Sequence, residues 1–359
     1  MSDAADFFAL GEAIRHSGLS SLLALYGFGR RRLEALRFDL ELGLLPAPFV
    51  GALRLLVFGE AVRSDELSWM PPRALAALVD AGVAMREGPS VRLNGFRLVA
   101  HYGVLLFAHQ PLRSAMFYHG DDSFGLGAAV AGQRGRVLDL CAGVGAQGLL
   151  AAATATEVVA VEIEPAAEPV FWLNHAMNYR DRNAVEFHCG DFIESVQGRR
   201  FDVIVCNPPL LPCPPELALP KLADGGADGL AFVRRLVTAL PGVLDTGGFA
   251  TCIGTILGDE SGPDVAALQS LAADSGVSLT LLVPARCPMT DGEEFFESYV
   301  RTLESKDGSP EAVVRSICGR HFRQTDHLYS FLMHATLGDD PPRFELSRHY
   351  VRGVGLWGV

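Results

Sequence analysis

Residues 136–148 read RVLDLCAGVGAQG, and this stretch decides the fold. RVLDL is a short apolar run typical of a buried strand, and Gly143-Val144-Gly145 turns the chain into the helical stretch that follows. Glycines at such a turn let the backbone approach a ligand closely, and Asp139 can accept a hydrogen bond or attract a cation. A Gly-x-Gly turn is also an ordinary strand–helix connection, so the flanking sequence must decide between the two interpretations.

The same alternation of a short apolar run and a helical stretch continues along the rest of the chain. Apolar runs rich in Val and Ile alternate with helical stretches such as AQGLLAAAT and GLAFVRRLVTAL; the further runs begin at residues 157, 184, 201, 248 and 278. Alternating strands and helices predict an α/β fold with a parallel sheet covered by helices on both faces. In such a sheet a ligand binds at the carboxyl ends of the strands.

Polar residues follow the next two strands at the point where a ligand is expected. Glu162 ends the run EVVAVE, where a carboxylate can accept hydrogen bonds from both hydroxyls of a ribose, and Ile163 comes next. Asp191 follows the third strand and can accept from an adenine amino group, while Phe192 can pack on the ring. Taken singly, these residues are equally well a solvated strand-end charge and an ordinary turn.

The fourth run, FDVIVC, leads directly into Asn207-Pro208-Pro209-Leu210. Two prolines remove two N–H donors and stiffen the backbone, which leaves carbonyl groups and the Asn207 side chain as acceptors. This arrangement suits a substrate nitrogen that carries hydrogens, although a Pro-Pro pair alone also fits a rigid loop.

These four elements in this order resemble the class I S-adenosylmethionine-dependent methyltransferases, in the Asn-Pro-Pro-x branch that methylates planar nitrogens. The resemblance implies a Rossmann-like domain with a mostly parallel seven-stranded sheet, with S-adenosylmethionine as cofactor, S-adenosylhomocysteine as product and no metal. The implied catalytic residues are Asn207, Pro208, Pro209 and Leu210. The implied cofactor-binding residues are Ser123, Asp139, Cys141, Gly143, Gly145, Glu162, Ile163, Asp191, Phe192 and Asn207.

A longer match narrows the resemblance to the protein-glutamine N5-methyltransferases that act on release factors. It consists of DGGADGL at 224–230 followed by AFVRRLV, together with Asn174 and Asn178, and it covers roughly residues 120–255. Two positions depart from the family pattern: Leu210 replaces an aromatic residue, and Cys141 replaces a glycine. We therefore expect methyl transfer to a glutamine-type amide. A small-molecule metabolite is the alternative acceptor, and a nucleic-acid base is a third.

The rest of the chain predicts two further parts. Residues 1–95 form a mainly helical, winged-helix-like accessory domain, because a helix starting near Pro71-Pro72 precedes two short strands around Gly88-Pro89. Residues 96–130 are a connecting segment and cofactor lid. The methyltransferase domain spans residues 131–359, with inserted helices at 293–322, a late strand at 327–335 and a C-terminal hairpin at 343–359.

Composition limits the partners and the compartment. The net charge is −12, and residues 1–95 hold 10 basic against 11 acidic residues, so nearly all of the negative charge lies beyond them. An acidic catalytic part argues against nucleic acid and favours a protein or small-molecule substrate. The seven cysteines include no Cys-x-x-Cys pair, and no run is long and apolar enough to span a membrane. We therefore expect a cytoplasmic protein without membrane contact, and a homodimer formed through the N-terminal domain is a further prediction.

Overall fold

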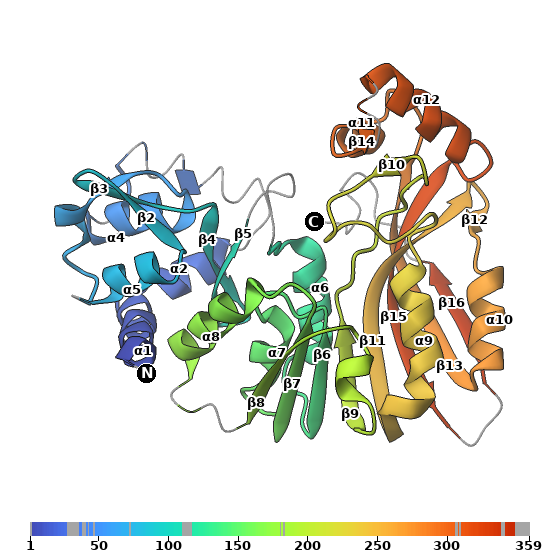
Figure 1. Cartoon of the computed structure of the whole chain (residues 1–359), viewed down its shortest axis with the longest axis horizontal. Coiled ribbons are helices and arrows are strands. Elements are labelled where there is room, and N and C mark those ends of the chain that lie inside the picture. The colour runs from blue at the N-terminus through green and yellow to red at the C-terminus, as the bar shows by residue number, and fades with distance from the viewer. Residues whose placement is uncertain are drawn as a thin grey trace. The chain divides into compact units, whose positions relative to one another are not determined.

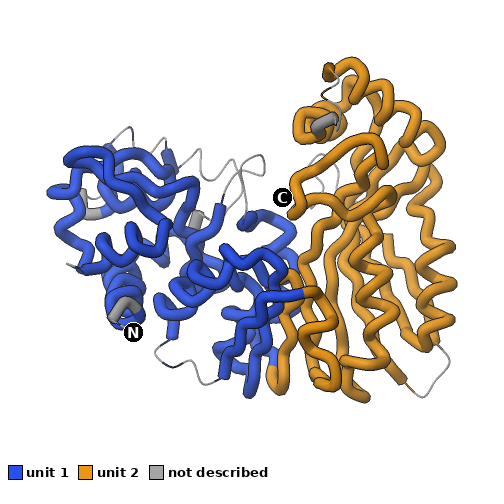
Figure 2. Tube along the Cα trace, in the orientation of Figure 1, with its two compact units in different colours: residues 1–133, 142–190 blue, residues 134–141, 191–359 orange. Residues whose placement is uncertain are grey.

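The computed structural model describes residues 2–26, 36–37, 41, 43–45, 47–71, 73–109, 117–179, 181, 184–305, 308, 310–338 and 342–348. The chain divides into two compact units, which Figure 2 colours separately. Unit 1 comprises residues 1–133 and 142–190, and unit 2 comprises residues 134–141 and 191–359. The predicted boundaries after residues 95 and 130 follow the sequence rather than these units and remain predictions.

Unit 1 starts with a helical part, as the sequence predicts. Its elements are α1 (Ser2–His16), α2 (Leu19–Tyr26), α4 (Ala47–Ala52), the π-helical turn η1 (Leu53–Val57), β1 (Val62–Arg63), the 3-10 turn η2 (Ser64–Leu67) and α5 (Ala74–Asp80). The predicted hairpin follows as β2 (Ala84–Glu87) and β3 (Ser90–Leu93), and β1 pairs with β3 as a third strand. The order of helix and hairpin is confirmed, and the winged-helix assignment remains a prediction.

The segment between these elements and the main sheet is a second hairpin followed by a helix. β4 (Phe96–His101) and β5 (Val104–His109) pair antiparallel, and α6 (Asp121–Val130) comes next. Tyr102 and Gly103 form the tight turn with φ of 50° and 90°. A tyrosine is unusual in the left-handed region, and its hydroxyl donates to the Phe124 carbonyl of α6 at 3.0 Å, which ties the hairpin tip to that helix.

The main sheet is built from alternating strands and helices (Figure 1). In unit 1 these are α7 (Ala146–Ala151), β7 (Glu157–Glu162), α8 (Ala167–Asn178) and β8 (Val185–Cys189). In unit 2 they are β6 (Arg136–Leu140), the 3-10 turn η4 (Glu194–Val196), β9 (Phe201–Cys206), α9 (Ala231–Val243), β11 (Leu244–Asp259), β12 (Gly262–Pro263), α10 (Ala266–Asp274), β13 (Val277–Pro288), β15 (His327–Leu337) and β16 (Phe344–Arg348). The short strands β10 (Leu217–Ala218) and β14 (Glu304–Ser305) pair with each other.

Among the described residues the strand order is β16-β13-β15-β11-β9-β6-β7-β8, with β12 paired to β11, which makes nine strands. The expected count of seven is therefore not confirmed. β12 folds back on the end of β11, and β16 adds a parallel edge strand to β13. β15 is antiparallel to both β11 and β13, whereas the pairs β6–β9, β9–β11 and β7–β8 are parallel.

Burial explains why the central strands have continuous apolar sequences. Every described residue of β9 except Asp202 is buried, and β11 is buried from Ala250 to Leu257. A strand covered on both faces has no solvent side on which polar residues could alternate. In unit 2, α9 packs on β11, β13 and β15, and α10 packs on β13.

The C-terminal predictions are confirmed in part. The inserted helices are α11 (Glu294–Val300) and α12 (Glu311–His321), and the late strand is β15. The expected hairpin at 343–359 is not formed by its described part, because β16 pairs in parallel with β13 instead of turning back on itself. Residues 349–359 lie outside the described residues.

Candidate functional site

In unit 1, the glycine turn and the acidic strand end meet. The Gly143 N–H donates to Glu162 Oε2 at 2.9 Å, and the Glu164 N–H donates to Oε1 at 2.9 Å. Two backbone donors thus fix the Glu162 carboxylate, and each oxygen keeps a lone pair for a further donor. The sequence placed these residues one strand–helix unit apart, and the structure brings them into direct contact.

Gly145 shows why this turn needs glycine. It caps the N-terminus of α7 with φ of 94°, and a Cβ atom there would lie 2.7 Å from the Phe171 ring. Gly143 has φ of 53°, and a Cβ there would meet no atom within 4 Å. The turn is therefore packed tightly on the side of Gly145 and open at Gly143.

Two other predicted cofactor residues of unit 1 differ in exposure. Ile163, a large apolar side chain directly after Glu162, is 67% exposed. It therefore offers apolar surface on which a flat ring could pack. Ser123 is buried at the start of α6, where its N–H donates to Asp122 Oδ1 at 2.7 Å and its carbonyl accepts from Gln147 Nε2 at 2.8 Å. Ser123 therefore joins α6 to α7 within unit 1.

Asn174 and Asn178 hold helix α8 against strand β5. Asn174 accepts from the Phe107 N–H at 2.8 Å and donates to the Phe107 carbonyl at 3.1 Å; Asn178 makes the same pair with Leu105 at 2.9 and 2.8 Å. One helical turn rises about 5.4 Å and two strand residues about 6.6 Å, so two side chains one turn apart can match alternate strand residues. The two asparagine amides thus make the hydrogen bonds to β5 that a neighbouring strand would make. Asn174 also donates to the Val144 carbonyl of the glycine turn at 3.0 Å.

His101 and His119 form a buried histidine pair within unit 1. Their rings are 0% and 1% exposed, and His119 Nε2 lies 3.1 Å from His101 Nδ1. Burial lowers the pKa of His101 to about 4 and lowers the pKa of His119 well below its usual value. Both rings are therefore neutral near pH 7. Among the residues that the structure describes, no group of three or more His, Cys, Asp and Glu side chains is arranged to hold a metal ion.

In unit 2, the end of β6 carries Asp139 and Cys141. Asp139 is 1% exposed, and Cys141 adopts φ of 56°. Cys141 thus lies in the left-handed region, where a Cβ atom is strained and glycine is favoured. Cys141 and Cys252 both interact with the thiol of Cys206, and burial raises the pKa of Cys206 well above its usual value.

The Asn207-Pro208-Pro209-Leu210 segment follows β9 at the same edge of the sheet. Leu140 and Cys252 are both register partners of Cys206, so Asn207 emerges between the ends of β6 and β11. Asn207 is half-buried and Leu210 is buried, with 8% exposure.

Three elements clamp the residues after Pro209. The buried Thr255 hydroxyl of β11 donates to the Leu210 carbonyl. The glycine-rich segment 223–229 runs alongside, because the Leu211 N–H donates to the Ala223 carbonyl and the Gly225 N–H donates to the Leu211 carbonyl, both at 2.8 Å. The segment after Asn207 therefore keeps its carbonyl groups in fixed directions.

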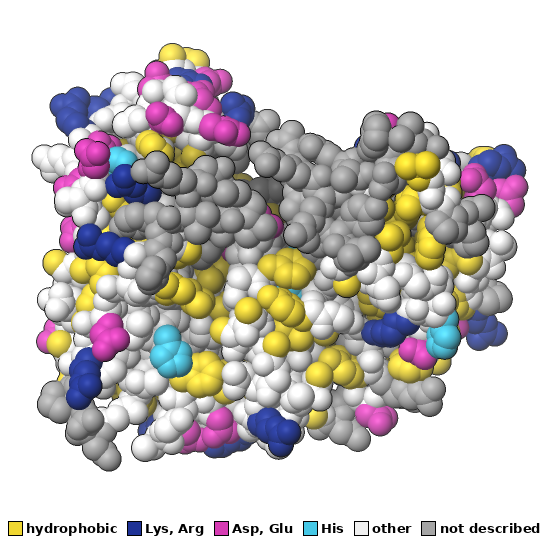
Figure 3. Space-filling view, turned by 180° about the vertical axis from the view of Figure 1, so that it is seen from behind, with side chains coloured by type: hydrophobic (Ala, Val, Ile, Leu, Met, Phe, Trp, Pro, Cys, Tyr) yellow, Lys and Arg dark blue, Asp and Glu magenta, His cyan; other side chains and the backbone are white. Residues whose placement is uncertain are grey.

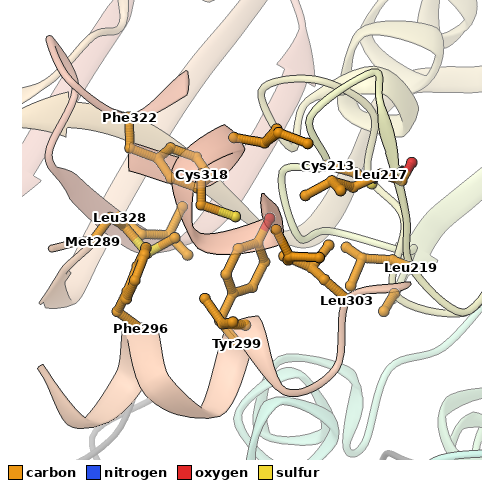
Figure 4. Packing of buried hydrophobic residues seen from close by; sticks show 14 of the residues in the cluster. Cys213, Leu217, Leu219, Met289, Phe296, Tyr299, Leu303, Cys318, Phe322 and Leu328 are labelled. Carbon is orange, nitrogen blue, oxygen red and sulfur yellow. Dashed lines mark hydrogen bonds between the residues drawn. The ribbon is translucent and has the colours of Figure 1, made fainter. Parts of the chain in front are cut away.

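The third element is the helical insertion. The Tyr299 hydroxyl of α11 donates to the Pro212 carbonyl (the ring is labelled in Figure 4). Tyr299 belongs to a second hydrophobic core that combines the segment 213–223 with α11 and α12. Its members include Cys213, Leu217, Met289, Phe296, Cys318 and Phe322. The sequence shows the insertion as helices but does not show that it supports the segment after Asn207.

The turn after β8 holds Asp191 and Phe192. Phe192 is 5% exposed and packs edge-on against Phe232 of α9, with ring centroids 5.9 Å apart. The Arg235 guanidinium donates from Nη2 to Asp191 Oδ1 at 2.6 Å. Phe192 is thus mostly covered by α9, whereas the Asp191 side chain keeps 32% exposure.

The comparisons with known proteins agree with this architecture. Residues 126–212 match the family model of the methyltransferase small domain. This confirms the predicted resemblance of the segment to class I S-adenosylmethionine-dependent methyltransferases.

Individual relatives sharpen that resemblance. The ribosomal protein uL3 glutamine methyltransferase of Bradyrhizobium diazoefficiens is 39% identical over 154 residues, which is 39% of this chain and 48% of the relative. The release factor glutamine methyltransferase of Clostridium acetobutylicum is 37% identical over 130 residues, 32% of this chain and 44% of the relative. The chain thus spans less than half the length of these curated relatives. Among solved structures, Trm5b of Pyrococcus abyssi aligns with a TM-score of 0.38 and 17% identity, over 70% of this chain and 62% of that one.

Proposed function

We propose that the protein is an S-adenosylmethionine-dependent methyltransferase that methylates the side-chain amide nitrogen of a glutamine in a protein. The observation that carries this proposal is the clamped Asn207-Pro208-Pro209-Leu210 segment at the end of β9. Asn207 to Leu210 fall inside the stretch that matches the methyltransferase family model. The names of the related proteins, which are glutamine methyltransferases, support the choice of acceptor.

The residues of the glycine turn fit the proposed cofactor. The Glu162 carboxylate is oriented by two backbone N–H groups and retains acceptor capacity for ribose hydroxyls. Ile163 offers exposed apolar surface for an adenine ring. When bound, S-adenosylmethionine supplies an electrophilic methyl group. Asp139, Cys141, Gly143, Gly145, Ser123, Asp191 and Phe192 complete the proposed cofactor-binding set.

Asn207 and Pro208 are the proposed catalytic groups. The Asn207 side-chain oxygen and the Pro208 carbonyl accept hydrogen bonds from the N–H groups of the acceptor amide, which favours a pyramidal nitrogen in the transition state. Holding the acceptor in line with the methyl group contributes about 7–11 kcal/mol at best. The proton leaves to solvent after transfer, so the reaction requires no general base.

Pro209 and Leu210 have a positioning role in this scheme. Leu210 is buried and its carbonyl accepts from Thr255, so the end of the segment is anchored in the protein interior. Pro209 lacks an N–H and restricts φ, which stiffens the link between this anchor and Pro208. An aromatic ring is absent at position 210, so recognition of the planar amide depends on hydrogen bonds rather than on stacking at this residue.

The proposed partner is a protein, and the proposed compartment is the cytoplasm. All seven cysteines lie among the described residues and none forms a disulfide bond, which supports a reducing environment. No helix in the described part of the chain is long and apolar enough to cross a membrane. On the face drawn in Figure 3, basic and acidic side chains are interspersed among the coloured residues, which gives no support for a nucleic-acid substrate. The homodimer remains a prediction.

Methyl transfer from labelled S-adenosylmethionine tests the function directly. The full chain is incubated with the labelled cofactor and a fractionated cell extract, and the protein, RNA and small-molecule fractions are counted separately. We expect the label in protein, on a glutamine side chain. Label in RNA or in small molecules would replace the proposed acceptor, and no transfer together with no binding of S-adenosylhomocysteine would refute the enzyme assignment.

A further inference from the structure

Arg235 of α9 contacts both residues of the turn that follows β8. Its Nη2 donates to Asp191 Oδ1 at 2.6 Å, and its guanidinium carbon lies 5.2 Å from the centre of the Phe192 ring. The same guanidinium lies 6.0 Å from the Phe232 ring, which itself packs edge-on against Phe192. All four residues belong to unit 2.

The geometry makes Arg235 a support for one particular orientation of the carboxylate. A charge-assisted hydrogen bond of this length is among the stronger polar contacts in proteins, and the planar guanidinium stacks on aromatic faces. The cation–π contacts with the two rings hold the guanidinium, and the guanidinium fixes Oδ1 of Asp191. A carboxylate has about four acceptor positions, so one ion-pair hydrogen bond leaves capacity for a further N–H donor.

We propose that Arg235 is a positioning residue that holds the Asp191 carboxylate for the exocyclic amino group of the cofactor's adenine, and thereby sets the selectivity for adenine. This inference rests on the proposed function, in which Asp191 accepts from adenine. Arg235 does not touch the reacting atoms; it acts through Asp191 and through the cover that it provides over Phe192.

The neighbouring Arg234 offers a matched control. It lies on the same helix, pairs with Asp228 through a 3.0 Å hydrogen bond from Nη1 and a second one from Nη2, and has a similar side-chain exposure of 41% against 47% for Arg235. Removing either arginine deletes one partly exposed ion pair from α9. Only the Arg235 substitution deletes the contact with Asp191.

The test compares two ligands by isothermal titration calorimetry with the full-length protein. S-adenosylhomocysteine carries the adenine amino group, and S-inosylhomocysteine has a carbonyl oxygen in its place. The variants are R235M, R235K and R234M, with thermal unfolding recorded for each to establish that it is folded.

The expected result is a loss of selectivity rather than a general loss of binding. R235M should weaken S-adenosylhomocysteine about fivefold to tenfold and S-inosylhomocysteine less than about twofold. R235K should fall between R235M and the parent, because it keeps the charge but not the planar stacking. R234M should leave both affinities within about twofold.

Each remaining outcome is decisive. An equal loss of affinity for both ligands in R235M indicates a merely structural role and overturns the inference, as does unchanged binding of S-adenosylhomocysteine. Equal binding of the two ligands by the parent protein overturns the adenine contact of Asp191 and with it the role of Arg235. If the parent protein binds neither ligand, the proposed function itself fails.

Discussion

Glu162 is the residue whose replacement most directly probes the cofactor half of the site. Its two carboxylate oxygens accept from the N–H groups of Gly143 and Glu164, each at 2.9 Å. In E162Q the side chain keeps its shape, but one of its two terminal groups becomes a donor that faces a backbone N–H. One charge-assisted hydrogen bond is then lost and a backbone donor loses its partner, which costs about 1.5–3 kcal/mol of stability.

The effect on cofactor binding should be larger than the loss of one contact. The amide presents a single oxygen to the two ribose hydroxyls, and the glycine turn loses the group that fixes it. We expect E162Q to weaken S-adenosylhomocysteine by about tenfold to a hundredfold, with calorimetry and thermal unfolding as the assays.

Glu164 provides the control for that experiment, because it lies two residues further on and its carboxylate accepts a long hydrogen bond of 3.4 Å from the Ala166 N–H. E164Q should leave the affinity within about twofold and the stability within about 0.5 kcal/mol. If E162Q binds S-adenosylhomocysteine as tightly as the parent protein does, Glu162 does not contact the ribose and the reasoning is refuted.

Three further predictions follow from backbone geometry and burial. Replacing Cys141, which adopts φ of 56°, should relieve strain, so C141G should raise the free energy of unfolding by about 1 kcal/mol in urea titration; a decrease would show that the thiol contacts outweigh the strain. Burial lowers the pKa of His101 from 6.5 to about 4, so the contribution of its neutral ring to the free energy of unfolding is fully present above pH 6.5 and is lost as the pH falls toward 4, by about 2 kcal/mol at pH 5. H101Q should flatten the dependence of the free energy of unfolding on pH over that range, and an unchanged slope would contradict the assignment. G145A should lower the free energy of unfolding by about 2 kcal/mol or more, because its Cβ would lie 2.7 Å from the Phe171 ring. The control G132A, at φ of 78° in open space, should lower it by only about 1 kcal/mol. Equal losses of stability in thermal unfolding would show that packing at the turn is loose.

The local pattern of the sequence was sufficient for the central part of the fold. Continuous apolar runs such as FDVIVC predict strands buried on both faces, and the glycine turn predicts a strand–helix connection at Gly145. The contact between Gly143 and Glu162 follows the same logic, because both lie at carboxyl ends of strands.

Other features depend on partners that are distant in sequence, so local patterns do not define them. The edge strand β16 reads like one arm of a hairpin, and only its pairing with β13 shows otherwise. The buried positions of His101 and His119 depend on how the β4–β5 hairpin packs within unit 1.

The residues that hold the segment after Asn207 were missed for the same reason. Thr255 is one of three threonines in a mostly apolar strand, and Tyr299 is an aromatic residue on an inserted helix. Each carried a usable signal, since a buried hydroxyl requires a hydrogen-bond partner, but the sequence does not say which carbonyl supplies it.

Mass spectrometry of the methylated acceptor tests the central claim most directly, with the parent protein and the N207A variant compared side by side. The parent protein should place a methyl group on a glutamine amide nitrogen of a protein. N207A should lower that rate by about a hundredfold or more and leave the affinity for S-adenosylhomocysteine within about twofold. A methyl group found on a metabolite or a base, or an equal loss of rate and cofactor affinity in N207A, would contradict the account.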